Sequence, residues 1–221
     1  MNYLTQKLLN KEELEFLKIN LNKKNALWED GKKTAGSYAA KVKNNLQLDR
    51  NSEISKKYSN LITKRILENS LIKSFFLPKH IHGTMFTKSL KGMKYGKHID
   101  NGFMSSGRAD LSFTLFINKI DKYDGGELII GDINSEHKFK LNEGEIVIYP
   151  SSYLHSVQEV LSGERLVFVG WIESYVRSTE LREYLFELDA GAKSILAKHG
   201  QSDELNLIFK SYTNFLRLLS E

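Results

Sequence analysis

Short β-rich runs fill the middle of the chain, from about residue 80 to residue 174, and limit its fold more than any other feature. Turn residues separate these runs, as in Asp124-Gly125-Gly126 and Asn142-Glu143-Gly144. Many short strands joined in this way are typical of a sandwich or a jelly roll. The expected strands cover residues 80–86, 111–118, 127–132, 138–141, 145–149 and 165–172.

Helical patterns flank this region. Asn10-Lys11-Glu12-Glu13 resembles a capping box, and leucines then repeat at helical spacing at positions 14, 17 and 21. A second helix is expected to follow Asn51-Ser52 and to end before Pro78. We expect both helices to pack against the sheet.

The helical period returns after Tyr175, and a clear apolar stripe follows. Its members are Leu205, Ile208, Phe209, Tyr212, Phe215, Leu216 and Leu219. We expect the stripe to pack on the β-rich core of the same chain. A homodimer contact through the C-terminal helices is the alternative.

The 221 residues include no cysteine, so any metal site must use His, Asp or Glu. The net charge is +5 and the lysines are scattered, which predicts a solvated surface more readily than a nucleic-acid surface. The N-terminus has no apolar core of signal-peptide length, and no segment approaches the roughly 20 apolar residues of a membrane span. We therefore expect a cytoplasmic protein without a membrane partner.

His98-Ile99-Asp100 and His155 have the spacing of a metal site. Residues two apart in a strand project to the same side, so His98 and Asp100 can bind one ion together. His155 follows the turn Pro150-Ser151-Ser152 and can supply a third ligand. Two imidazoles and one carboxylate leave three coordination positions open, which suits Fe(II) with a chelating cosubstrate and dioxygen. Zinc is not excluded by the ligands alone.

Arg165 follows His155 by ten residues, and its planar guanidinium matches a carboxylate such as the far end of 2-oxoglutarate. The alternative is a surface residue paired with Glu164 or Glu145. His80 and His82 also have strand spacing, but no carboxylate or arginine stands near them in a comparable pattern. We expect structural or incidental roles for these two histidines.

Motifs spread over nearly the whole chain resemble the PKHD-type hydroxylases, bacterial and phage relatives of the prolyl 4-hydroxylase class of Fe(II)- and 2-oxoglutarate-dependent dioxygenases. The resemblance rests on Trp28-Glu29-Asp30-Gly31 with Thr34-Ala35-Gly36, residues 42–48, 95–100, 108–112 and 123–128, Tyr149-Pro150-Ser151-Ser152 with Leu154-His155, and residues 185–189.

This resemblance implies a mainly β fold with flanking helices, whose core is a double-stranded β-helix of the jelly-roll type. The dioxygenase domain would span residues 1–176, with the core at about 80–174 and a C-terminal helical extension at 177–221. The resemblance also implies Fe(II) bound by His98, Asp100 and His155, 2-oxoglutarate held by Arg165, dioxygen as co-reactant, and ascorbate as a stimulant.

One position departs from the family pattern. Relatives often carry a tyrosine about nine residues before the first histidine ligand, where this chain has Ser89. Tyr95 is three residues from His98, which in a regular strand places it on the opposite face. Thr114 and Trp171 are the remaining candidates for a second cosubstrate contact.

Candidate substrate residues lie near the metal motif and near the N-terminus. Residues 101–107 are a short loop of the kind that forms a lid, and Arg108 and Asp110 after it either position substrate or pair with each other. Asn44 and Asn45 either line the substrate entrance or stabilise a loop through their amides.

By resemblance, the expected reaction is hydroxylation of a protein side chain such as a prolyl residue, coupled to decarboxylation of 2-oxoglutarate to succinate. The alternatives are an oxygenase acting on a nucleic-acid base or a small metabolite, a zinc or manganese cupin, and a jelly-roll binding module without catalysis.

Overall fold

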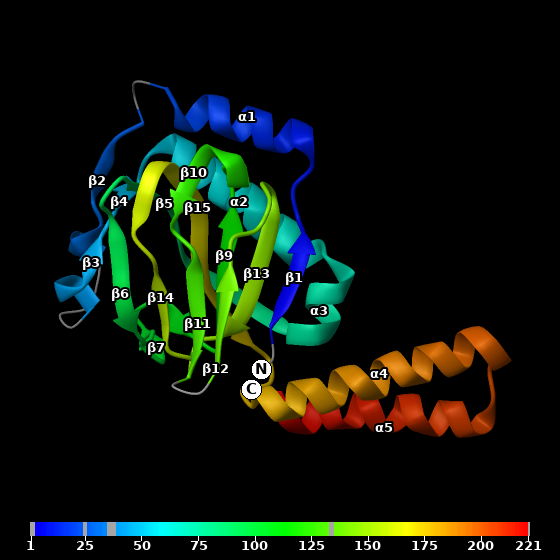
Figure 1. The fold of residues 1–221 in the computed structure, drawn as a ribbon. Coiled ribbons are helices and arrows are strands. Elements are labelled where there is room, and N and C mark those ends of the chain that lie inside the picture. The colour runs from blue at the N-terminus through cyan, green and yellow to red at the C-terminus, as the bar shows by residue number, and fades with distance from the viewer. Residues whose placement is uncertain (1–2, 24–25, 35–38, 133–134, 221) are drawn as a thin grey trace.

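Two antiparallel β-sheets form the body of the protein (Figure 1). The computed structural model describes residues 3–23, 26–34, 39–132 and 135–220. The larger sheet has the order β1-β13-β9-β15-β5-β4-β2, with β10 also paired to β15, and the smaller sheet has the order β12-β11-β14-β6-β3. This arrangement is the expected double-stranded β-helix.

The larger sheet contains β1 (Leu4–Lys7), β2 (Trp28–Asp30), β4 (Leu46–Leu48), β5 (Pro78–Leu90), β9 (Leu111–Phe116), β10 (Tyr123–Gly125), β13 (Glu145–Pro150) and β15 (Val160–Ser174). The smaller sheet contains β3 (Lys43–Asn44), β6 (Lys94–His98), β11 (Leu128–Asp132), β12 (Ser135–Phe139) and β14 (His155–Val157). A short ribbon pairs β7 (Phe103–Met104) with β8 (Gly107–Arg108).

Three helices pack on the larger sheet: α1 (Lys11–Leu21), α2 (Glu53–Glu68) and α3 (Ser70–Phe76). The capping box at the start of α1 is confirmed, because the Asn10 side chain accepts from Glu13 N at 2.9 Å and Glu13 accepts from Asn10 N at 3.0 Å. The buried leucines of α1 and the isoleucines of α2 join the apolar cluster over the sheet. Both helices therefore buttress the sheet, as expected.

The second expected helix is divided in the structure. Asn69 ends α2 and begins α3, where its side-chain oxygen accepts a hydrogen bond from Ile72 N at 3.0 Å. Extended backbone at Asn69 interrupts the helical hydrogen bonds, while its side chain satisfies a free N–H of the next helix. The expectation of one continuous helix up to Pro78 was therefore wrong.

A second apolar cluster joins the two sheets across the interior. Its buried members are Phe116, Leu128, Ile130, Phe139, Val147, Tyr149 and Val167, which come from strands of both sheets. Burying these side chains holds the sheets together, and the remaining interior space holds the candidate site described below.

The C-terminal helices α4 (Thr179–His199) and α5 (Asp203–Leu219) form a hairpin that extends from one end of the barrel (Figure 1). Gly200, with a φ of 78°, lies at the turn between them. Phe186 of α4 packs edge-on against Phe75 of α3, with ring centroids 4.7 Å apart, and ties the hairpin to the barrel.

The apolar stripe of α5 packs along α4 and not across the sheets, so the expectation that it covers the barrel was wrong. The turn at Gly200 reverses the chain onto α4, and this leaves Leu207, Phe215 and Leu218 exposed. The domain limits at residues 176 and 177 stay a prediction. No helix in the described ranges combines the length and hydropathy needed to span a membrane.

Candidate metal and cosubstrate site

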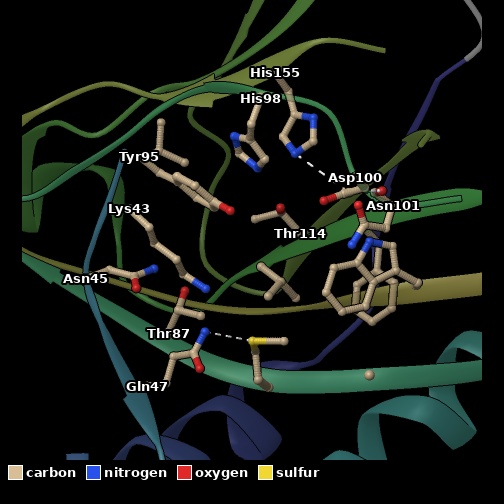
Figure 2. Close-up of a pocket in the computed structure, with 18 of the residues that line it drawn as sticks. Lys43, Asn45, Gln47, Thr87, Tyr95, His98, Asp100, Asn101, Thr114 and His155 are labelled. Carbon is tan, nitrogen blue, oxygen red and sulfur yellow. Dashed lines mark hydrogen bonds and ion pairs between the residues drawn. The ribbon is translucent and has the colours of Figure 1, made fainter. Parts of the chain in front are cut away.

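Three potential metal ligands meet between the two sheets (Figure 2). His98 ends β6 and His155 begins β14, and these two residues lie directly opposite each other in the antiparallel pair. Asp100 lies two residues beyond β6. Ligand atoms of the three side chains all lie within 4.8 Å of one another, and His155 Nε2 is 3.7 Å from Asp100 Oδ2.

Hydrogen bonds orient each of the three side chains. The Nδ1 atoms of His98 and His155 face the backbone oxygens of Gly96 at 2.8 Å and Tyr153 at 3.1 Å. Because a carbonyl only accepts, Nδ1 carries the proton in this arrangement and Nε2 keeps its lone pair for a metal. Ser112 Oγ donates to Asp100 Oδ2 at 2.6 Å and fixes the carboxylate.

The electrostatics of the cluster also favour metal binding. Burial, and then the neighbouring His155, lower the pKa of His98 well below its ordinary value. His98 is therefore neutral at physiological pH, which is the form that binds a metal. Two imidazoles and one carboxylate on one side of an open space fit a divalent iron ion.

The ring of Tyr95 stacks on His98, with centroids 3.7 Å apart and planes 19° from parallel. The expectation that Tyr95 lies on the opposite face was therefore wrong. His98 pairs with His155, and Tyr95 pairs with Val157. The two paired residues are three positions apart in β6 but only two apart in β14, so β6 contains a bulge. This bulge breaks the regular alternation and turns Tyr95 to the same side as His98.

The three ligands open onto a cavity of about 720 Å³ between the sheets. Ser89, Thr114, Arg165 and Trp171 also line this cavity. The structure thus brings every sequence-predicted metal and cosubstrate residue to one space, although β5, β6, β9, β14 and β15 are far apart along the chain.

Arg165 is a buried cation in this cavity, with an exposed fraction of 3%. Among the described residues it has no ion pair, and its Nε is buried without a hydrogen-bond partner. The two suggested surface partners are engaged elsewhere: Glu164 pairs with Lys88 at 3.2 Å, and Glu145 accepts from Asn142 N at 2.9 Å. A buried, unpaired guanidinium is costly, so the arrangement favours a bound anion.

Comparisons with known proteins agree with this geometry. Residues 84–173 match the 2OG-Fe(II) oxygenase superfamily. A PKHD-type hydroxylase of Prochlorococcus marinus strain MIT 9215 is 72% identical over 221 residues, covering 100% of both chains. The PKHD-type hydroxylase of strain NATL1A is 56% identical, again over 100% of both chains. The chain belongs to the PKHD-type hydroxylases. It is therefore an enzyme of the 2OG-Fe(II) oxygenase class.

Solved structures support the fold of this hydroxylase. A Pseudomonas putida prolyl-4-hydroxylase superposes with a TM-score of 0.57 at 18% identity, covering 78% of this chain and 92% of that chain. A prolyl hydroxylase from Trichoplax adhaerens, in complex with a hypoxia inducible factor peptide fragment, gives 0.54 at 13% identity, covering 83% and 86%. At these identities the likeness extends to the fold alone.

Tyr149 is a residue of the hydroxylase site to which sequence reasoning gave no role. It is buried on β13, lines the cavity, and interacts electrostatically with Arg165. Burial raises the pKa of Tyr149 well above its ordinary value, so its hydroxyl keeps its proton and can donate. Tyr149 can thus supply the contact absent at Ser89. The signal available in the sequence was its place in the motif Tyr149-Pro150-Ser151-Ser152, at the end of a predicted strand.

The hydroxylase leaves space for the Arg165 side chain at Gly126. This glycine has a φ of 69°, and a Cβ atom there would lie 2.9 Å from Arg165 Cδ. Two independent constraints, the backbone conformation and the close approach, therefore require glycine at this turn.

Arg108 and Asp110 pair with each other and do not line the cavity. Arg108 Nε donates to both carboxylate oxygens of Asp110, at 2.9 and 3.0 Å. His82 contacts the preceding loop, with Nδ1 2.9 Å from Ser106 Oγ and Nε2 2.8 Å from the Arg108 carbonyl. These contacts fix the loop at the cavity mouth, and they give His82 a structural role, as expected.

Asn44 and Asn45 have different surroundings. Asn44 is exposed and lies outside the cavity, whereas Asn45 is buried and lines it. Of the motif Thr34-Ala35-Gly36, the last two residues lie outside the described residues.

Proposed function

We propose that this hydroxylase couples decarboxylation of 2-oxoglutarate to hydroxylation of a protein side chain, with a prolyl residue as the first candidate. One observation carries the proposal: the His98-Asp100-His155 cluster and the unpaired Arg165 open onto one cavity. The structural neighbours named prolyl hydroxylases support the choice of substrate by analogy.

His98, Asp100 and His155 would hold Fe(II), which supplies the oxidising chemistry with dioxygen when it is bound. Arg165 binds the far carboxylate of 2-oxoglutarate, and the hydroxyl groups of Tyr149 and Thr114 are donors within the same cavity. The indole Nε1 of Trp171, buried without a hydrogen-bond partner, is a further donor.

The test is incubation with Fe(II), 2-oxoglutarate and proline-containing peptides under ¹⁸O-labelled oxygen gas. We expect one succinate for each hydroxylated peptide, and ¹⁸O in the new hydroxyl group, measured by mass spectrometry. Added ascorbate should increase the number of turnovers before inactivation. Hydroxylation that proceeds without 2-oxoglutarate, or that takes its oxygen from water, would contradict the proposal.

A homodimer contact through α4 and α5 stays a prediction from the sequence. The exposed apolar side chains Leu207, Phe215 and Leu218 give a second copy an apolar surface on α5. Light scattering after size-exclusion chromatography should give twice the chain mass, and Leu218→Glu should restore the single mass. A single mass for the unmodified chain at high concentration contradicts a dimer.

A further inference from the structure

A second group of hydrogen-bond donors lines the same cavity, apart from the metal and Arg165. It consists of Lys43, Asn45, Gln47 and Arg50, which we call the donor cluster. Figure 2 shows Lys43, Asn45 and Gln47 on one wall of the cavity, below Tyr95 and the three ligands. Lys43 lies on β3, Asn45 between β3 and β4, Gln47 on β4, and Arg50 in the turn that follows.

Arg50 and Asn45 have few hydrogen-bond acceptors among the described residues. Gln47 Nε2 and Arg50 Nη2 both donate to the thioether sulfur of Met85, at 2.9 and 3.1 Å. A thioether is only a weak acceptor. Asn45 Oδ1 is buried without a partner, and it lies where a Cβ on Gly31 would lie, so its amide NH₂ is the end left for the cavity.

Lys43 is the most unusual member, because a lysine is almost never fully buried without a partner. Its exposed fraction is 6%, and its Nζ lies 5.3 Å from the centre of the Tyr95 ring. Within the described part of the chain, neither Lys43 nor Arg50 forms an ion pair with a carboxylate. Asp30 and Asp100 influence Lys43 only at longer range.

The charges along the cavity do not balance. Lys43, Arg50 and Arg165 line it, whereas Asp100 is its only lining carboxylate among the described residues, and Asp100 belongs to the metal cluster. A 2-oxoglutarate carboxylate on Arg165 would still leave the buried Lys43 without a carboxylate partner, whereas solvent reaches the exposed Arg50.

The donor cluster is separate from the cosubstrate end of the cavity. The strongest electrostatic neighbours of Arg165 are Tyr123, Tyr149 and Glu127, whereas those of Lys43 are Arg50, Asp100 and Asp30. Neither cation is among the electrostatic neighbours of the other, and Lys43 (β3) and Arg165 (β15) lie on different sheets, so we expect separate anions at the two ends of the cavity.

We propose that Lys43, with Arg50 and the amides of Asn45 and Gln47, binds a carboxylate of the substrate and so holds the carbon to be hydroxylated near the metal ligands. Tyr95 lies between Lys43 and His98, in contact with both, so the carboxylate sits close to the metal cluster. This inference rests on the proposed function, because it assigns the substrate class of that same site. The carboxylate belongs either to a free acid or to an acidic residue beside the hydroxylated one.

The protonation of Lys43 is consistent with an anion in this place. Burial, and then the neighbouring Arg50, lower the pKa of Lys43 to about 8. Lys43 is still mostly protonated at neutral pH, and a bound carboxylate would stabilise its charge further.

The test measures binding by calorimetry to the full chain loaded with Mn(II) and 2-oxoglutarate without oxygen. The first pair of probes is N-acetyl-L-proline and its neutral amide. The second pair is two capped peptides in which proline is followed by glutamate or by glutamine. The variants are Lys43→Met, which keeps the length of the side chain, and Lys43→Arg, which keeps the charge. Arg50→Met tests the exposed member of the cluster, and Lys41→Met removes an exposed lysine that does not line the cavity.

We expect the acidic member of at least one pair to bind about tenfold or more tightly than its neutral twin, as for a charge-assisted hydrogen bond. Lys43→Met should remove this preference and Arg50→Met should reduce it, while Lys43→Arg and Lys41→Met should retain it. If only N-acetyl-L-proline binds more tightly than its amide, the substrate is a free acid. If the glutamate peptide binds more tightly than the glutamine peptide, the substrate is an acidic peptide.

The proposal is overturned if no acidic probe binds more tightly than its twin, or if Lys43→Met keeps the preference. The proposed function fails separately. Acidic probes that bind through Lys43 but are never hydroxylated in the labelled-oxygen assay would contradict the prolyl substrate and leave the carboxylate subsite standing.

Discussion

Replacing Asp100 with alanine should abolish tight Fe(II) binding and lower 2-oxoglutarate turnover by more than about 100-fold. Asp100 is the only carboxylate in the described ligand cluster, and without it only the two imidazoles would remain to bind the metal. Bound iron after anaerobic gel filtration and succinate formation are the two measurements. Asp121→Ala, which removes an exposed acid far from the cluster in the chain, is the matched control.

Ser112→Ala gives a graded form of the same experiment. Ser112 is not one of the three metal ligands. Its hydroxyl donates a hydrogen bond to the Asp100 carboxylate at 2.6 Å. Loss of a hydrogen bond to a metal ligand typically costs about 10- to 100-fold in metal affinity. Asp100→Ala with undiminished iron content would show that the metal is held elsewhere, and the triad assignment would fail.

The predictions that succeeded rest on local patterns. The capping box at Asn10 involves only residues within one helical turn. His98 and Asp100 lie two residues apart, and His155 lies opposite His98 in one strand pair. Short-range patterns of this kind can be recognised in the sequence. The long strands were also predictable, because β5 and β15 carry enough residues to show a pattern. Strands of two or three residues, such as β3 and β4, carry no such pattern and were missed, although a strand was expected to begin at His155, where β14 starts.

Sequence reasoning failed where the result depends on how distant elements pair. Tyr149 and Arg165 line the same cavity because β13, β9 and β15 are neighbours in the larger sheet, and that order cannot be read from any one strand. The bulge in β6 redirected Tyr95, and the turn at Gly200 determined what α5 covers. The donor cluster around Lys43 was hidden for the same reason, because its partner Met85 lies on another strand.

Replacing Arg165 with methionine should weaken 2-oxoglutarate binding by about 2–5 kcal/mol, the usual cost of truncating one partner of a buried charge pair, which corresponds to roughly 30- to 4,000-fold. Tyr149→Phe should cost less, about 1.5–3 kcal/mol, since it removes one hydrogen bond to a charged group. Arg165→Lys should fall between the unmodified chain and the methionine variant, because it keeps the charge and loses the planar fork. Calorimetry with the metal-loaded, oxygen-free protein measures all three.

The stability of the same variants without ligand separates a binding role from a structural one. Arg165 is buried without an ion pair among the described residues, so its charge costs free energy in the empty protein. Arg165→Met should therefore leave the free energy of unfolding unchanged or raise it, while 2-oxoglutarate should stabilise only the unmodified chain against heating. If Arg165→Met instead destabilises the empty protein and leaves 2-oxoglutarate affinity intact, the guanidinium supports the barrel and the cosubstrate is held by other groups.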